Sequence, residues 1–228
     1  RTLLDTTRIL SSHLQAGFGQ LGRDATMLAM LAGGLPLPGG PVPTAAQAQS
    51  LETLAQMFRA QLLARPGLLQ VQLIGLRDHG LELVHLQRLA DERIVRVVGA
   101  ALQEKAHFPY VYETARLTSG GGYFTEFGIN REDGVPQEER AVFSVAAPVV
   151  QGTAVVAVVV LRVDAEAFLR HFGATLPAPY GFYLASRWGD FLAHPEREKA
   201  FGFDRGQRVL GQEEFVATAA LLSGAARE

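Results

Sequence analysis

The amino-acid sequence predicts an α+β protein in which a long N-terminal helix leads into a mostly antiparallel sheet. Apolar residues recur at helical spacing over residues 1–32, and from residue 68 onward the apolar period changes to two, as in β-strands. Short connections join successive strand-like segments, so neighbouring strands should pair antiparallel. Helices set beside such a sheet define an α+β layout.

The first segment carries a leucine repeat. Leu14, Leu21 and Leu28 recur seven residues apart, with Ala25 and Ala32 beside them. A heptad repeat of this kind is typical of a helix that packs along one seam. We therefore expect one helix over residues 1–32, and we expect the repeat to form a parallel dimer seam in the full protein.

Three glycines of this helix spell "GFGQLG" at residues 17–22, a formal match to the dinucleotide-binding fingerprint. That fingerprint needs a strand before it and an acidic residue about 20 positions later. Here a helical pattern precedes the glycines, and "LPGGPV" lies where the acid should be. Close packing of the helix through small residues is the favoured interpretation.

The remaining elements follow from turn residues and periodicity. Thr44 is the expected N-cap of a second helix, which Pro66 and Gly67 end. Further along the chain we expect strands at 68–76, 81–89 and 93–98, a short helix at 99–106, strands at 122–130, 140–150 and 153–163, and a helix capped by Asp164.

A second unit begins after the fourth helix. Residues 180–206 contain two apolar runs around a turn at 187–190, but the chain that follows is too short for an independent core. The sequence thus predicts a leading helix and loop at 1–43, a first lobe at 44–174, and an incomplete second lobe at 175–228.

Composition excludes several classes of function. The 228 residues are 48% hydrophobic and 19% charged, a balance typical of a globular chain. The net charge is −2, from 21 basic and 23 acidic residues, which argues against a nucleic-acid partner. The absence of cysteine excludes thiol catalysis, cysteine-ligated zinc and disulfides. Gln151 and Gly152 divide the most apolar stretch, 141–163, into two strand-length pieces, so no spanning helix is expected there.

His194, in the segment "HPEREK", is the candidate for catalysis. It could act as a base near Glu196 or Glu198 in a hydrolytic enzyme, but no nucleophile or orienting residue lies within reach in the sequence. The favoured alternative is a strand end at which His194 bonds a loop carbonyl and the charged residues are solvated. The six histidines lack metal-ligand spacing, so neither a metal nor a cofactor is expected.

Polar residues near the expected strand ends suggest a ligand pocket instead. Small-molecule sites are mostly apolar, with a few polar groups that fix orientation. The alternative is that the tyrosines lie at the edge of the core and the charges face water. The candidate residues are Tyr110, Tyr112, Tyr123, Asp164, Arg88, Glu126 and Arg131.

Four segments together resemble a known family. They are "YFTEFGINREDG", "PQEERAVFSVAAPVV", "VVAVVVLRVDAEAF" and "FYLASRWGDFLAHPEREKAFGFDRG", in that order. They resemble the extracytoplasmic double Cache sensor domains of bacterial membrane receptors, also called PDC or PAS-like domains. The likeness runs from about Thr44 to Gly211. It is greatest to the sensor regions of histidine kinases and diguanylate cyclases.

The resemblance implies the periplasmic region of an inner-membrane receptor, tethered by segments outside this chain. It implies a membrane-distal lobe that binds a small molecule, self-association through the N-terminal helix, and a proximal lobe marked by the His-Pro segment, without catalysis. A sensor histidine kinase is the favoured receptor. The alternatives are a diguanylate cyclase or chemoreceptor, a dimerisation module without ligand, and a hydrolytic enzyme that uses His194.

Family binding residues transfer in part. Double Cache domains that bind amino acids carry an Arg-x-Trp-Tyr stretch, then a tyrosine, then an aspartate; Tyr112, Tyr123 and Asp164 match the last three. Pro109 and Val111 replace the arginine and tryptophan, so the carboxylate clamp is missing and free amino acids are doubtful ligands. A lone Asp164 suits a cationic or hydrogen-bond-donating ligand, or it simply caps its helix.

Overall fold

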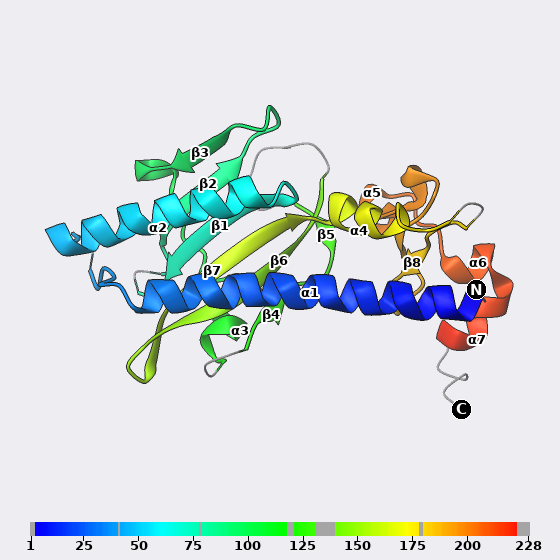
Figure 1. Cartoon of the computed structure of the whole chain (residues 1–228), viewed down its shortest axis with the longest axis horizontal. Coiled ribbons are helices and arrows are strands. Elements are labelled where there is room, and N and C mark those ends of the chain that lie inside the picture. Colours follow the sequence, from blue (N-terminus) through cyan, green and yellow to red (C-terminus); the bar gives the residue numbers. More distant parts are fainter. Residues whose placement is uncertain are drawn as a thin grey trace. The chain divides into compact units, whose positions relative to one another are not determined.

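A computed structural model of the chain is shown in Figure 1. The residues that it describes are 3–40, 42–77, 79–117, 121–130, 140–177 and 180–222.

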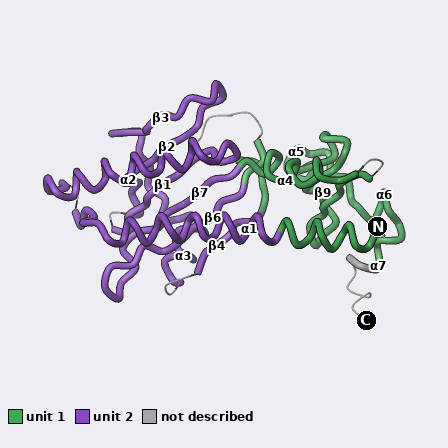
Figure 2. The backbone as a smooth tube through the Cα atoms, in the orientation of Figure 1, with its two compact units in different colours: residues 1–14, 127–142, 164–228 green, residues 15–126, 143–163 purple. Residues whose placement is uncertain are grey.

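The chain divides into two compact units (Figure 2). Unit 2 comprises residues 15–126 and 143–163, and unit 1 comprises residues 1–14, 127–142 and 164–228.

Helices and strands occur in an order that confirms the predicted α+β class. The helices are α1 (Leu3–Gly33), α2 (Ala45–Ala64), α3 (Pro109–Ala115), α4 (Ala165–Gly173), α5 (Gly202–Arg205), α6 (Gly211–Glu214) and α7 (Ala219–Leu222), with 3₁₀ turns η1 (Gly99–Ala101), η2 (Arg197–Lys199) and η3 (Val216–Thr218). The strands are β1 (Leu68–Gly75), β2 (Glu82–Arg88), β3 (Ile94–Val97), β4 (Tyr123–Phe124), β5 (Gly128–Ile129), β6 (Ala141–Gln151), β7 (Ala154–Asp164), β8 (Leu184–Ala185) and β9 (Phe191–Ala193).

The main sheet has the strand order β3-β2-β1-β7-β6-β4, with β5 also paired to β6. Its pairs β1–β2, β1–β7, β2–β3, β4–β6 and β5–β6 are antiparallel, as predicted. Every residue of β1 is buried, because helices cover both faces of the sheet beside it. In unit 2, α1 and α2 lie in front of the sheet in the view of Figure 1.

Helix α1 confirms the predicted long helix but not its predicted seam. Leu21, Ala25, Leu28 and Ala32 are between 0% and 7% exposed, because they pack within the chain's own unit 2. The same spacing serves an amphipathic helix on a sheet as well as a helix in a coiled coil. These four residues are therefore covered within the chain itself, whereas Leu14 is only half-buried, and self-association of the full protein stays a prediction.

The glycines of "GFGQLG" lie inside α1, without a strand before them, so the context of a nucleotide fingerprint is absent in this described part of the chain. A Cβ atom added at Gly22 would lie 3.4 Å from Cζ of Phe124. The Phe18 ring meets the same Phe124 ring edge-on, with centroids 6.0 Å apart. The small residues thus allow an aromatic side chain, rather than a second helix, to approach α1.

Helix α2 begins and ends as its sequence indicates. Thr44 and Gln47 form a reciprocal capping box, in which each side chain accepts a hydrogen bond from the other's backbone N–H. At the other end, the Arg88 guanidinium donates to the carbonyl oxygens of Leu62 and Leu68. This contact joins strand β2 to the last turn of α2.

Two elements differ from the prediction. The short helix expected at 99–106 is only the 3₁₀ turn η1, and the helix of this region is α3, which begins at Pro109. The strand expected at 122–130 is divided into β4 and β5. Thr125 explains the division. The Ser144 N–H donates to Thr125 Oγ1 at 2.8 Å instead of to a backbone carbonyl oxygen of a paired strand.

In unit 1, helix α4 begins where it was predicted to begin. The Asp164 carboxylate accepts a hydrogen bond from the Ala167 N–H at 2.8 Å, which makes Asp164 the N-cap. The predicted turn before β9 is present, with Ser186 N–H bonded to the Asp190 carbonyl. No helix within the described residues has the length and hydropathy that a bilayer crossing demands.

Replacing Arg88 with methionine should lower the free energy of unfolding by about 2–3 kcal/mol, because a nearly buried guanidinium bonded to carbonyl oxygens is lost. Urea denaturation measures the change. The control is Arg93→Met, whose side chain is 71% exposed and pairs with Asp91 on the surface; it should cost less than about 1 kcal/mol. Equal losses of unfolding free energy in the two variants would contradict a stabilising role for the hydrogen bonds from Arg88 to Leu62 and Leu68.

Candidate ligand-binding site

Helix α3 covers one face of the unit 2 sheet with an apolar cluster. Tyr110 and Val111 of α3 pack against Ile74, Val158 and Val160 of strands β1 and β7. Pro109 starts the helix at a position where its missing N–H costs nothing. The ring of Phe108 stacks on Tyr110 at 5.5 Å between centroids. This cluster fixes α3 over the sheet.

The same face continues into a row of polar side chains. Gln72 lies two residues before Ile74, so both point to the α3 side of the sheet. Cross-strand pairing places His85 beside Gln72, and Arg162 beside Gln70. Their exposed fractions are between 1% and 5%. We name Gln70, Gln72, His85 and Arg162, together with Glu82, the polar row.

Glu82 organises one end of the polar row. Its Oε1 accepts from Gln72 Nε2 at 3.1 Å, and its Oε2 accepts from the Gln103 N–H at 3.0 Å and lies 3.2 Å from His85 Nδ1. Burial tends to raise the pKa of Glu82, but hydrogen bonding and the charges of His85 and Lys105 outweigh burial and hold this pKa below its usual value. A charged, fully bonded carboxylate therefore anchors the row.

On this buried face, polar atoms of two neutral side chains have no hydrogen-bond partner among the described residues. They are Oε1 of Gln72 and Oγ1 of Thr114, and both residues are at most 1% exposed. Thr114 lies on the buried side of α3, with Tyr110 and Val111. Since buried polar atoms are nearly always bonded, these two are available to a ligand. An apolar face with a few polar groups has the composition of a small-molecule site.

Of the residues predicted for the pocket, Tyr123 is one of two that lie at this face. It is partly buried and packs against the apolar cluster. Tyr110, from the same predicted group, is a member of that cluster. Tyr112 is 41% exposed, and the Arg116 guanidinium lies 5.8 Å from its ring centroid. Glu126 is exposed as well.

The other three candidates are placed differently. Arg88 points to the α2 side of the sheet, where it bonds the helix end. Asp164 belongs to unit 1, where its carboxylate caps α4. Arg131 lies outside the described residues. The described contacts of Arg88 and Asp164 are structural.

Sequence reasoning missed the polar row, although "LLQVQLIG" contains its signal. Gln70 and Gln72 stand two residues apart in a strand that is otherwise apolar on both faces. In a strand covered on both sides, polar residues with a period of two mark one polar stripe rather than a solvated face. Arg162 gives the same signal in β7, where residues 157–163 are all buried.

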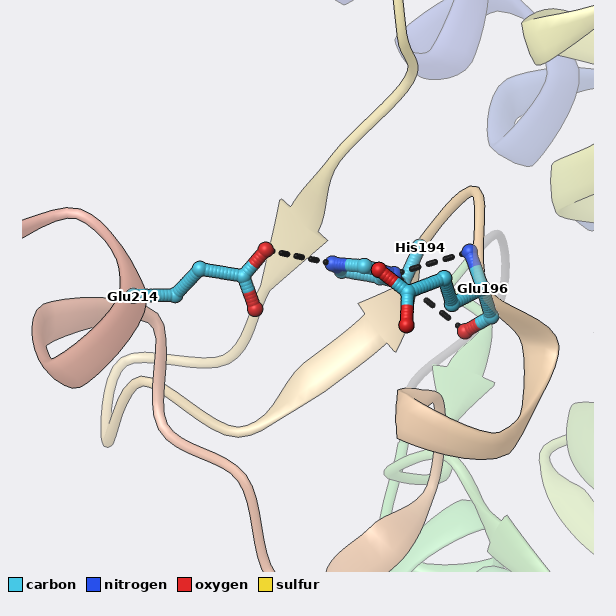
Figure 3. A group of neighbouring side chains, drawn as sticks. All are labelled: His194, Glu196 and Glu214. Carbon is cyan, nitrogen blue, oxygen red and sulfur yellow. Dashed lines mark hydrogen bonds and ion pairs between the residues drawn. The ribbon is translucent and has the colours of Figure 1, made fainter.

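His194 lies in unit 1, in a closed network rather than an open catalytic site (Figure 3). Its side chain is 1% exposed. Nδ1 accepts from the Glu196 N–H at 2.9 Å, which leaves Nε2 to donate to Glu214 Oε1 at 3.1 Å. The predicted hydrogen bond to a loop carbonyl is replaced by one to a loop N–H, because an Nδ1 that accepts has no proton for the Glu196 carbonyl oxygen 3.2 Å away.

His194, Glu196 and Glu214 lie near enough for their ligand atoms to approach one cation, all within 4.8 Å of one another. The ammonium group of Lys199, however, bonds Glu196 Oε1 at 2.9 Å and Glu214 Oε2 at 3.1 Å. The hydrogen bonds from Lys199 and His194 hold the pKa of Glu214 below its usual value. The Lys199 ammonium group therefore bridges the two carboxylates and already bonds both of them.

No protein-family model and no curated protein matches this sequence. Solved structures do match. A domain of a sensory box/GGDEF family protein from Vibrio parahaemolyticus has a TM-score of 0.72 at 13% identity, over 94% of this chain and 79% of that one. The extracellular domain of a protein described as the histidine kinase vpHK1S-Z8 has a TM-score of 0.64 at 14% identity, over 95% and 80%.

A third similar structure is the sensory domain of the Campylobacter jejuni chemoreceptor Tlp3 with isoleucine bound. Its TM-score is 0.60 at 12% identity, over 85% of this chain and 69% of that one. Identity this low establishes a shared fold and no activity. The chain therefore has the fold of bacterial sensor domains, and this confirms the fold that the resemblance implied.

Replacing His194 with alanine should lower the free energy of unfolding by about 1–3 kcal/mol, because two hydrogen bonds of a buried ring are lost. Binding of any ligand to unit 2 should be unchanged, since His194 belongs to unit 1. Calorimetric unfolding and ligand titration measure the two effects. His13→Ala, at an exposed position of α1, is the control and should change stability by less than about 0.5 kcal/mol. A tenfold loss of ligand affinity in folded His194→Ala would contradict the structural role.

Proposed function

We propose that this chain is the extracytoplasmic small-molecule-sensing region of a bacterial transmembrane signalling receptor. The observation that carries the proposal is the polar row, which lies buried under α3 in a domain with the fold of sensors. Similar folds support it, since one such domain comes from a chemoreceptor with isoleucine bound. Small-molecule sites combine apolar walls with a few fixed polar groups in the same way.

In this proposal the ligand lies between α3 and the polar row, beside Tyr123. The unbonded Oε1 of Gln72 requires a hydrogen-bond donor, and the Thr114 hydroxyl can donate or accept. A small molecule with hydroxyl or ammonium groups satisfies both. This agrees with the hydrogen-bond-donating ligand expected from the sequence. Tyr112, Asp164, Arg88, Glu126 and Arg131 stay predictions as further ligand contacts.

The receptor is a sensor histidine kinase in this proposal, held in the inner membrane by segments outside the chain, with this region in the periplasm and without catalysis of its own. Similar folds in histidine kinase, GGDEF and chemotaxis proteins support each of these three output classes. Ligand occupancy is transmitted only if the ligand has different affinities for two states of the receptor.

A thermal-shift screen of small metabolites tests the site, because a ligand of the native state raises the unfolding temperature. Thr114→Val should weaken a hit at least about tenfold, which is about 1.4 kcal/mol. Without ligand the same change should be neutral or stabilising, because it removes an unbonded buried hydroxyl. Thr53→Val, on exposed α2 surface, is the control.

The two arms of that experiment separate the outcomes. If Thr114→Val loses stability without ligand, its hydroxyl has a partner within the chain. If affinity is also unchanged, the ligand site is elsewhere. Asp164→Asn keeps the helix cap, so a loss of affinity there would instead support the predicted role of Asp164 in recognising a cation.

Self-association through α1 stays part of the proposal, but through a different face from the leucine repeat. Met27, Met30 and Leu31 are 47%, 73% and 43% exposed, and they form an apolar stripe on α1. The chain has no cysteine, so single cysteines can be introduced cleanly. In the intact receptor, Met30→Cys should form disulfide cross-links between copies, while Ala25→Cys, fully buried, should not. Equal cross-linking at both positions would contradict this face.

A further inference from the structure

Unit 1 contains a cavity of about 450 Å³ that shares no residue with the polar row of unit 2. One face of α4 forms a wall of the cavity, since Glu166, Leu169, Arg170 and Gly173 recur at helical spacing. The opposite wall includes β9 and the residues that follow it; α4 and β9 both belong to the unit coloured green in Figure 2. The volume is in the range of small-molecule sites.

The carboxylate in this cavity is already paired. Glu166 Oε2 accepts from Arg197 at 2.7 Å, and its Oε1 accepts from Arg205 at 2.8 Å. Burial tends to raise the pKa of Glu166, but the two arginines outweigh burial and hold this pKa below its usual value. Glu166 is thus charged and neutralised by the chain itself, so it offers little attraction to a cationic ligand.

Positive charge at the cavity is in excess. Arg170 and Arg197 both line it, against the single carboxylate of Glu166. The Arg170 guanidinium, which is exposed, forms no hydrogen bond or ion pair with the part of the chain that the structure describes. His194 also lines the cavity, but both of its ring nitrogens are engaged elsewhere, by Glu196 and Glu214. The Arg170 guanidinium is therefore the group left to meet a polar ligand, with Arg197, which also bonds Glu166, beside the same cavity.

We propose that this cavity is a second ligand site, which binds a small organic carboxylate with an apolar body. The carboxylate lies between Arg170 and Arg197, because guanidinium groups bind carboxylates through paired hydrogen bonds. The apolar body lies against Leu169, Phe182 and Leu192, which also line the cavity. A cation is disfavoured by the guanidinium groups of Arg170, which is exposed at the cavity, and of Arg197.

Methyl NMR of the leucine-labelled chain tests this site with benzoate, and with benzylamine and benzamide as the cationic and neutral counterparts. Benzoate should shift the Leu169 and Leu192 methyl signals saturably, while benzylamine should not. Arg170→Gln should weaken benzoate binding at least about tenfold. The control is Arg187→Gln, because Arg187 stacks on Trp188 in the neighbouring turn and does not line the cavity.

Several results would overturn the proposal. Benzylamine shifts as large as those of benzoate would exclude charge selection. Unchanged affinity in Arg170→Gln, or shifts confined to leucines of unit 2, would place binding elsewhere. No shift with any of the three probes would show that the cavity does not take such a ligand. Thr114→Val should leave benzoate affinity unchanged, so that this site stands or fails independently of the one under α3.

Discussion

The burial of strand β1 on both of its faces is the constraint on which unit 2 depends. A strand covered by helices on each side has no solvated face, so each polar side chain in it must find a partner inside. Gln70 and Gln72 meet this requirement through each other and through Glu82. Glu82 in turn stays charged because His85 and a backbone N–H bond it. Gln70, Gln72, Glu82 and His85 of the polar row therefore form one connected network rather than a set of separate contacts.

Local chemistry made much of the fold predictable. Periodicity identified α1 and the long strands, and short-range capping identified Thr44 and Asp164 as helix starts. These features depend on residues within a few positions of one another, which a sequence displays directly. The prediction failed where the partner is distant in sequence. The leucine repeat of α1 cannot reveal whether a sheet or a second helix covers it, and the division of one strand into β4 and β5 depends on Thr125 meeting Ser144.

The candidate site was less predictable for the same reason. Resemblance indicated Tyr123, which lies beside the apolar cluster under α3, but matched residues in a family motif do not reveal which side chains are bonded within this chain. Arg88 and Asp164 have the charges that a ligand needs, yet Asp164 caps α4, and Arg88 bonds backbone carbonyls and the Glu92 carboxylate. Only the pairing register, which places His85 beside Gln72 and Arg162 beside Gln70, gathers the polar row.

The unbonded atoms of Gln72 and Thr114 also set what the site can discriminate. Each buried, unbonded polar atom costs about 1–3 kcal/mol, and a ligand that bonds it recovers that free energy. A molecule of the same shape that lacks hydrogen-bonding groups leaves these two atoms unbonded. It does not recover their free-energy cost, so the proposed site would bind it more weakly. The charged end of the row adds no such selectivity, because Glu82 is already bonded. Specificity at the site proposed under α3 thus follows from two neutral atoms, whereas selection at the site proposed in the unit 1 cavity follows from charge.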